Sequence, residues 1–220
     1  MSNVSHLLNT NSSWREEFAR VVGCEHCTSS TDHNLLRDNA ENIPQPGWVG
    51  SNYSRTRLLL VGQNPGTPKS LAAEDLPYTA ALRTLRDDNT ENKYEELVAV
   101  LRTFIPQWPV HGNYFPLAES GLTLEDIAYC NVVRCRTHID KKPGTRLVSN
   151  CISQHFSRWL ALLQPKAVVF IGKWAAERGG PAVTAAGVPY TFMNRHRSLS
   201  TLARTENRSA VVHFVRTKAG

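Results

Sequence analysis

The chain has 220 residues, of which 41% are hydrophobic and 20% charged, a composition typical of a globular protein and unlike that of a disordered or fibrous chain. Its purely apolar runs, such as 58–61 and 167–171, are far shorter than the ~20 residues that a membrane-spanning helix needs. The net charge of +6 favours a polyanionic partner such as nucleic acid without establishing one.

The N-terminal segment has neither the basic start nor the apolar stretch of a secretory signal, which predicts a cytoplasmic protein. The length suits one large domain or, at a stretch, two small ones, and no internal repeat or low-complexity tract divides the chain. We therefore expect a single domain over residues 1–220 that acts as a monomer and has no membrane partner.

The first half of the chain predicts one buried strand between helices. Ser13 and Glu16 have the spacing of a capping box, and apolar residues at helical spacing lead from there to Cys24. The apolar run 57–61 ends abruptly in a Gly-Gln-Asn-Pro-Gly loop at 62–66. In order, the expected elements are a helix from Ser13, a loop over 28–54, a strand over 57–61, and helices over 78–86 and 94–105.

The second half alternates strands with helices. The clearest pattern is that of the helix over 147–163, whose apolar residues repeat every three or four positions. In order, the expected elements are a strand over 127–133, the helix over 147–163, a strand over 166–171, a helix from Lys173, a strand over 190–193 and a helix over 206–217.

This alternation predicts an α/β fold of three layers, α/β/α, around a central, mostly parallel sheet of about four strands. Such sheets bind ligands at the carboxyl ends of their strands. The loops at 62–66, 131–135 and 194–200 follow three of the expected strands, so we expect them to meet in one crevice.

The cysteines point to a metal site. Five are present, and an odd number in a chain expected to be intracellular argues against a disulfide framework. Cys24 and Cys27 form a C-x-x-C turn, and Cys135 and Cys151 flank a 15-residue segment that contains a Lys-Lys-Pro-Gly turn. Four thiolates can ligate zinc or hold a cubane iron–sulfur cluster, and the alternative is that they are isolated buried thiols. Cys130 lies within an expected strand and is predicted to be a core thiol.

Four segments in chain order resemble the uracil-DNA glycosylase superfamily, and most closely its iron–sulfur branch, families 4 and 5. GQNPG at 62–66 is similar to the family's water-activating loop, and CNVVRCR at 130–136 to the TNVVKCRPP segment of that branch. HRSLS at 196–200 is similar to the His-Pro-Ser-Leu motif, and PKAVVFIGKWAAE at 165–177 to a PKVIVALG strand and turn. The spacing of Cys24, Cys27, Cys135 and Cys151 agrees with the cluster ligands of that branch, and the resemblance spans about residues 23–204.

Three positions depart from that branch. Gln63 stands where family 4 has Glu, and Asn64 instead matches the GINPG and GMNPG loops of the mismatch-specific and single-strand-selective branches. Arg197 replaces the proline of the third motif. Hypoxanthine and mismatched thymine are therefore alternatives to uracil as the substrate base.

The resemblance implies a catalytic pair. Asn64 would orient the attacking water through its side-chain oxygen, and His196 would donate a hydrogen bond to uracil O2 as the base departs. From the residues alone, Asn64 has the alternative role of shaping the turn before Pro65.

Further residues are expected to bind the substrate. The loop residues Gly62 and Gln63 would approach the base, with the Gln63 N–H on uracil O2, and the carboxamide of Asn131 would match both O4 and N3–H. In the third motif, Ser198 lies beside Leu199, which would fill the gap left by the flipped nucleotide. Tyr78 would stack on the base. The alternatives are that Asn131 caps a loop and that Tyr78 and Leu199 are core residues.

The resemblance also implies a structural [4Fe–4S] cluster on Cys24, Cys27, Cys135 and Cys151, in preference to zinc, because zinc ribbons usually repeat the C-x-x-C knuckle. The expected partner is DNA that contains uracil or another deaminated base. Phosphates are expected to meet two basic groups, Arg134, Arg136, Lys141, Lys142 and Arg146 on one side and Arg195, Arg197 and Arg204 on the other.

The predicted activity is that of a monofunctional uracil-DNA glycosylase, because the three motif loops contain no lysine for lyase chemistry. Two alternatives remain. One is a relative that traps uracil-DNA covalently through a histidine, for which the corresponding interval offers His138. The other is a non-catalytic iron–sulfur or zinc protein that binds nucleic acid.

Overall fold

A computed structural model of the chain describes residues 11–27, 43–66, 76–105, 115–137, 141–194 and 200–220. The chain divides into two compact units, each built from three segments. The first, which we term the helical unit, comprises residues 1–46, 64–107 and 133–155, and the second, the sheet unit, comprises residues 47–63, 108–132 and 156–220. The single domain expected from the sequence stays a prediction.

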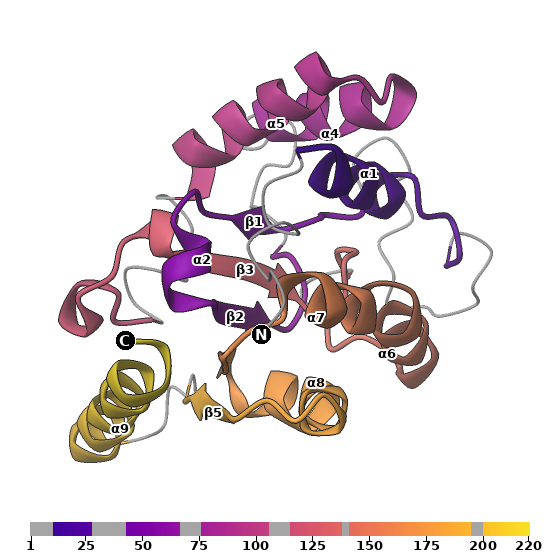
Figure 1. Cartoon of the computed structure of the whole chain (residues 1–220). Helices are drawn as coiled ribbons and strands as arrows, with labels where there is room; N and C mark the ends of the chain where they lie inside the picture. The colour runs from indigo at the N-terminus through magenta and orange to yellow at the C-terminus, as the bar shows by residue number, and fades with distance from the viewer. Residues whose placement is uncertain (1–10, 28–42, 67–75, 106–114, 138–140, 195–199) are drawn as a thin grey trace. The chain divides into compact units, whose positions relative to one another are not determined.

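The sheet unit contains a five-stranded, mostly parallel sheet (Figure 1). Its strands are β1 (Trp48–Val49), β2 (Leu58–Gly62), β3 (Ile127–Asn131), β4 (Ala167–Ile171) and β5 (Tyr190–Met193), in the order β1-β3-β2-β4-β5. β2 pairs in parallel with β3 and β4, β5 pairs in parallel with β4, and β1 is antiparallel to β3. The expected α/β fold with four largely parallel strands is confirmed.

The fifth strand, β1, was not predicted, because two residues are too few to show an alternating pattern. It is placed by its surroundings: Gly47 has a φ of 112°, and a Cβ there would lie 2.3 Å from the Tyr129 carbonyl oxygen. Glycine therefore lets the chain approach β3 closely enough for Trp48 to pair with Tyr129.

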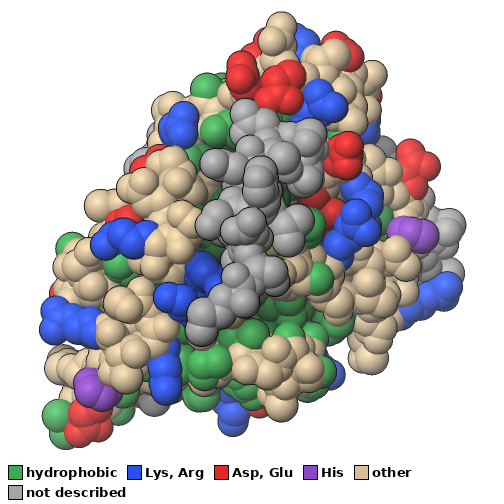
Figure 2. All heavy atoms as spheres, viewed as in Figure 1, with side chains coloured by type: hydrophobic (Ala, Val, Ile, Leu, Met, Phe, Trp, Pro, Cys, Tyr) green, Lys and Arg blue, Asp and Glu red, His purple; other side chains and the backbone are tan. Residues whose placement is uncertain are grey.

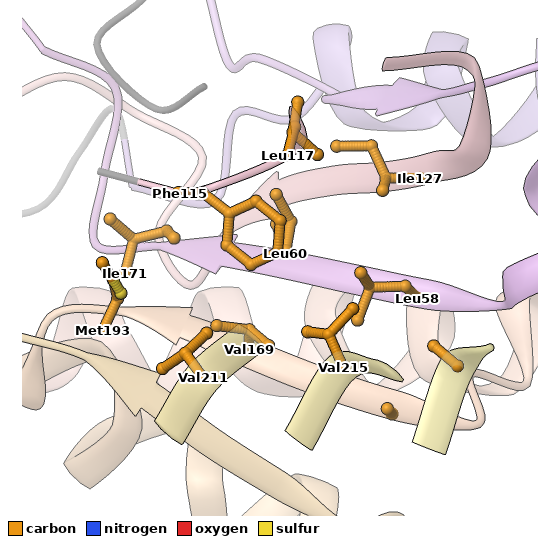
Figure 3. Packing of buried hydrophobic residues seen from close by; sticks show 12 residues of the cluster. Leu58, Leu60, Phe115, Leu117, Ile127, Val169, Ile171, Met193, Val211 and Val215 are labelled. Carbon is orange, nitrogen blue, oxygen red and sulfur yellow. The ribbon is translucent and has the colours of Figure 1, made fainter. Parts of the chain in front are cut away.

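One face of the sheet is covered by α9 (Thr201–Ala219). Leu58 and Leu60 of β2 and Val169 of β4 point toward Val211 and Val215 of α9 (Figure 3). These side chains are buried, and because they alternate along the strands they all lie on the same face.

The opposite face carries α8 (Lys173–Ala185), which packs on β4 and β5. Phe170, which alternates with the α9-facing residues of β4, lies 6.5 Å between ring centroids from Phe156, next to α7 (Ser157–Leu163). Helices thus cover both faces of the sheet within this unit, as the three-layer prediction requires.

The sheet unit is completed by α2 (Tyr53–Thr56) and two 3-10 turns, η4 (Ala118–Ser120) and η5 (Leu124–Asp126). Asp126 ties them together: its carboxylate accepts from Arg55 at 2.7 Å, and its backbone carbonyl accepts from the Thr56 hydroxyl. The turn that leads into β3 is thereby fixed to the turn that leads into β2.

The described elements of the helical unit are α1 (Asn11–Val22), α4 (Leu76–Asp87), α5 (Glu91–Phe104) and α6 (Thr145–Cys151). The predicted helix over 147–163 is present from 145 onward, but a π-helical turn, η7 (Ile152–Phe156), interrupts it between α6 and α7. No helix in the described parts of the chain is both long and apolar enough to cross a membrane.

Candidate functional site

In the sheet unit, the carboxyl ends of β2 and β3 bring Gly62, Tyr129 and Asn131 together. Gly62 pairs with Asn131, and Tyr129 lies two residues earlier on the same face of β3. The Tyr129 hydroxyl donates to Asn131 Oδ1 at 2.9 Å. This bond fixes the carboxamide of Asn131, which is only 5% exposed.

Gly62 is required by this arrangement. A Cβ at this position would lie 2.3 Å from Asn131 Oδ1 and 2.9 Å from the Tyr129 hydroxyl oxygen. The absence of a side chain thus makes room for the amide. Gln63, the next residue, is half-buried.

The Asn131 amide can both donate and accept. Its oxygen has two lone pairs, of which the Tyr129 hydroxyl uses one, and among the described residues its Nδ2 group makes no hydrogen bond. A partner with an acceptor beside an N–H donor matches it. The hydrogen bond from Tyr129 to Asn131 joins two residues of β3. It is not a cap on a neighbouring loop, which is the alternative role that the sequence left open for Asn131.

In the helical unit, Asn64 is held by two hydrogen bonds. Its Nδ2 group donates to Thr137 Oγ1 and to the Pro65 carbonyl, each at 3.1 Å. The bond to Pro65 is of the kind that shapes a turn, whereas the bond to Thr137 joins segments 73 residues apart. Arg136 Nε donates to the Gly66 carbonyl at 3.1 Å, a second tie between the same two segments.

Tyr78 is fully buried in α4, and its ring stacks on Phe104 of α5, with centroids 6.3 Å apart. The structure therefore gives it a packing role in the helical unit. Stacking on a flipped base stays a prediction.

His196, Ser198 and Leu199 lie outside the described residues, but the chain on both sides of them is anchored. On one side, Asn207 of α9 accepts from the Asn194 backbone N–H at 2.7 Å and donates to the Phe192 carbonyl at 3.2 Å. On the other, Ser200 Oγ accepts from the Ala203 N–H at 3.1 Å and caps α9. Asn207 was missed by sequence reasoning, because a polar residue within a helix carries no distinctive signal.

All four cysteines proposed as ligands belong to the helical unit. Cys24 is partly exposed, and Cys27, Cys135 and Cys151 are buried. Burial, together with the nearby Cys151, Cys27 and Cys24, raises the pKa of the Cys135 thiol far above its usual range. The thiols are thus near enough to affect one another. Cys130 lies in β3 and is fully buried, as expected of a core thiol.

Three of these sulfur atoms accept N–H hydrogen bonds. Asn150 Nδ2 donates to Cys27 Sγ at 3.7 Å. Burial raises the pKa of Cys151 to about 12, while a hydrogen bond from the Arg134 backbone lowers it. Burial also raises the pKa of Cys24, and a hydrogen bond from the His26 backbone opposes this. Such donors stabilise thiolates.

A pocket of about 480 Å³ opens beside Cys24, lined also by Arg20, His26 and His155. His155 lies in the π-helical turn and is 2% exposed, and among the described residues neither of its ring nitrogens has a hydrogen-bond partner. Burial, then the positive charges of Arg134 and Arg20, lowers the pKa of His155 to about 3, so the ring is neutral at physiological pH.

Within the described parts of the chain, no three His, Cys, Asp or Glu side chains converge closely enough to ligate one metal ion. What the structure shows for these cysteines is that their thiols influence one another electrostatically.

Two arginines expected to contact phosphates are internal supports instead. Arg134 and Arg136 are 1% and 4% exposed, and their guanidinium groups donate to the carbonyls of Pro46, at 2.6 Å, and Gly66. The exposed cations of this group are Lys141, Lys142 and Arg146.

The helical unit also has an acidic end. Figure 2 shows acidic side chains gathered where α4 and α5 lie in Figure 1. The exposed carboxylates there are Asp87, Asp88, Glu95 and Glu96. Two of these carboxylates are paired with cations of the same helices, Asp87 with Arg86 and Glu96 with Lys93.

Comparison with models of known protein families gives a match. The model of the uracil DNA glycosylase superfamily matches residues 50–214, three quarters of the chain. A search of curated proteins finds no matching sequence.

Proposed function

The chain belongs to the uracil DNA glycosylase superfamily, and on this premise we propose that it removes uracil from DNA by hydrolysing the N-glycosidic bond, which leaves an abasic site. Members of this superfamily act on DNA as glycosylases. The observation that carries the choice of uracil is the Asn131 amide, fixed by Tyr129 and packed over Gly62 at the carboxyl end of the sheet.

Uracil matches this amide. The base edge offers O4 as an acceptor and N3–H as a donor, so Asn131 Nδ2 donates to O4 while Oδ1 uses its second lone pair for N3–H. Cytosine presents the reversed pattern and would leave both groups unpaired, at a cost of about 1–3 kcal/mol for each buried group. To reach the amide, the base must first leave the stack, which costs a few kcal/mol.

Bond cleavage is proposed to depend mainly on electrostatics. As the N-glycosidic bond lengthens, the sugar becomes positive and the departing base negative, with its charge spread over O2, N1 and O4. Fixed donors aimed at this anion lower the barrier. By resemblance, the donors are His196 and the Gln63 N–H, both on O2. Asn64 orients the water, and because the sugar is already cationic, little basicity is needed from an amide.

We propose that Cys24, Cys27, Cys135 and Cys151 hold a [4Fe–4S] cluster. Three observations support the fit: the four thiols interact electrostatically, three of them accept N–H bonds, and the nearby His155 lacks a partner among the described residues. The cluster, when bound, supplies cross-linking of residues 24–27 to residues 135–151 and no bond-breaking chemistry.

The test is excision from end-labelled oligonucleotides that contain uracil, hypoxanthine or thymine, each opposite guanine or adenine. Alkali then cuts the strand at abasic sites. We expect uracil to be removed fastest, with no strand break before alkali. Asn64→Ala and His196→Ala should lose excision and retain most of their DNA affinity.

Other outcomes would overturn the proposal. Binding of uracil-DNA without excision indicates a non-catalytic nucleic-acid-binding protein, and a protein–DNA adduct that survives denaturation indicates covalent trapping. Excision at the normal rate by both variants would remove Asn64 and His196 from the mechanism.

A further inference from the structure

We propose that Thr137 is a positioning residue that sets the polarity of the Asn64 amide, so that its oxygen and not its nitrogen is presented to the attacking water. This inference rests on the proposed function of Asn64. It starts from the chain of hydrogen bonds that runs from Asn64 through Thr137 to the Lys141 carbonyl.

A carboxamide needs such a device because its two ends have nearly the same shape. The oxygen accepts hydrogen bonds, whereas the NH₂ group only donates them. An amide that orients a nucleophilic water must accept from it, since the water attacks through its own lone pair. Rotation of the Asn64 amide by half a turn would replace that acceptor by a donor.

The Thr137 hydroxyl has a single hydrogen, and that hydrogen is already committed. Oγ1 donates to the Lys141 carbonyl at 2.5 Å, and Thr137 is fully buried. Toward Asn64 it therefore offers only lone pairs, which the Nδ2 group fits at 3.1 Å.

The second hydrogen-bond partner of Asn64 Nδ2 favours the same orientation of the amide. The Pro65 carbonyl, also at 3.1 Å, is an obligate acceptor. A rotated amide would face two acceptors with its own oxygen. Arg136 meanwhile holds the Gly66 carbonyl, so the loop is fixed by Arg136 and the amide is fixed by Thr137.

The hydroxyl does not belong to the motif that this segment resembles. Cys135-Arg136-Thr137 corresponds to the Cys-Arg-Pro of TNVVKCRPP, in which the third residue has no donor or acceptor in its side chain. The chain thus departs from that motif at the residue that orients its amide.

The first test compares Thr137→Val with Thr137→Ser in single-turnover excision of uracil. Valine keeps the shape and removes the acceptor, so we expect the rate constant to fall by about 10- to 100-fold, with the DNA dissociation constant changed less than about twofold. Serine keeps the hydroxyl and should restore most of the rate. Equal rates for the valine variant and the wild type would overturn the inference.

A variant at residue 64 distinguishes a positioning role of Thr137 from a purely structural one. In an Asn64→Ala background, Thr137→Val should have no further effect on the rate, because its only route to the chemistry is lost. A full additive loss in this background would show that Thr137 acts through the fold alone.

Thr56→Val is the matched control. Thr56 is also buried, donates to a backbone carbonyl and accepts a backbone N–H, that of Leu58, at 3.2 Å. We expect this variant to lower the melting temperature about as much as Thr137→Val while leaving the excision rate within about twofold. A rate loss equal to that of Thr137→Val would contradict a specific role for Thr137.

A readout that needs no activity separates this inference from the proposed function. In the ¹⁵N NMR spectrum, the Asn64 side-chain NH₂ signal, assigned by its loss in Asn64→Ala, should show slowed exchange with solvent in the wild type and faster exchange in Thr137→Val. An inactive wild type with this protected signal overturns the glycosylase proposal and keeps the Thr137–Asn64 coupling. An active wild type whose signal does not respond to the substitution overturns the coupling.

Discussion

Because Gly62 has no side chain, the Asn131 amide fits beside it. At Gly62 a Cβ would overlap Asn131 Oδ1, so even a methyl group must displace the amide or its Tyr129 partner. The importance of this glycine rests on where the neighbouring atoms lie and not on backbone conformation.

Gly62→Ala is therefore expected to lower uracil excision by about 100-fold, the range seen when one well-placed polar contact is lost, while DNA binding persists. Gly66→Ala is the control, because a Cβ there meets nothing within 4 Å, and it should retain activity within about threefold. Single-turnover excision and a binding titration measure both. Equal losses in the two variants would mean that the loop, and not the Asn131 amide, is what Gly62 protects.

At this scale the sequence allowed residue types to be predicted better than contacts. Asn64 and Asn131 were identified from their motifs, but their partners Thr137 and Tyr129 were not, since nothing in the sequence pairs a hydroxyl with an amide. Arg134 was expected on the surface because it lies in a basic run, yet its guanidinium group is buried against a backbone carbonyl.

Among the elements, α9 both packs on the core and holds the chain that leads to the third motif. Through Asn207 it holds the end of β5, where the chain enters the segment that contains His196. The two bonds of this one amide extend the edge of β5 as a neighbouring strand would.

Asn207→Ala is expected to slow excision about tenfold, because the chain that leads to His196 loses its anchor, with a smaller change in DNA affinity. The control is Thr205→Ala, an exposed residue of α9 whose hydroxyl bonds only within the helix, to the Thr201 carbonyl. Single-turnover rates at saturating enzyme provide the measurement. A wild-type rate for Asn207→Ala would show that α9 does not position the third motif.

The turn before β3 predicts an acid-sensitive contribution to stability. Burial alone would raise the pKa of Asp126, but hydrogen bonds from Arg55 and Thr123 outweigh it and lower the pKa below 3.8. A carboxylate whose pKa is lower in the folded state than in the unfolded state stabilises the fold at pH values above the unfolded-state pKa. It loses that effect as the pH falls through the folded-state pKa.

Asp126→Asn should thus reduce the free energy of unfolding by about 1 kcal/mol at neutral pH, a modest amount because Arg55 is exposed and its attraction is screened. The gap to the wild type should close below about pH 4, the ordinary range for Asp. Urea unfolding at several pH values gives the comparison, with the exposed Glu177→Gln as a control that shows no such gap. A gap that persists at low pH would exclude the carboxylate as its source.

Elements with long patterns were predicted well and short or interrupted ones were not. The apolar runs of β2 and β4 indicated buried strands, and both are buried throughout. The π-helical turn η7 was not predicted, because the apolar stripe of Ile152, Phe156 and Trp159 continues across it and hides the extra residue.

For the molecule as a whole, the proposed cluster concerns one unit only. All four thiols lie in the helical unit, whereas Cys130 lies in the sheet unit. Loss of the cluster should therefore affect the two units unequally.

We expect Cys135→Ser to abolish bound iron and the brown colour of the purified protein and to lower the melting temperature by several degrees. Cys130→Ala should keep its iron, since it removes only a core thiol of β3. Metal analysis and visible absorbance decide between these outcomes. Iron retained by Cys135→Ser, or zinc in place of iron in the wild type, would contradict the cluster.

The threading of the chain through both units sets an order of assembly during synthesis. The last segment of the helical unit ends at His155, so all four thiols have been translated before β4, β5 and α9 exist. At about 5–20 residues per second, β4 follows Cys151 within about 1–4 seconds. In that interval the ligands of the proposed cluster are complete while the central β2 still awaits its neighbour β4, so insertion of the proposed cluster does not require a finished sheet.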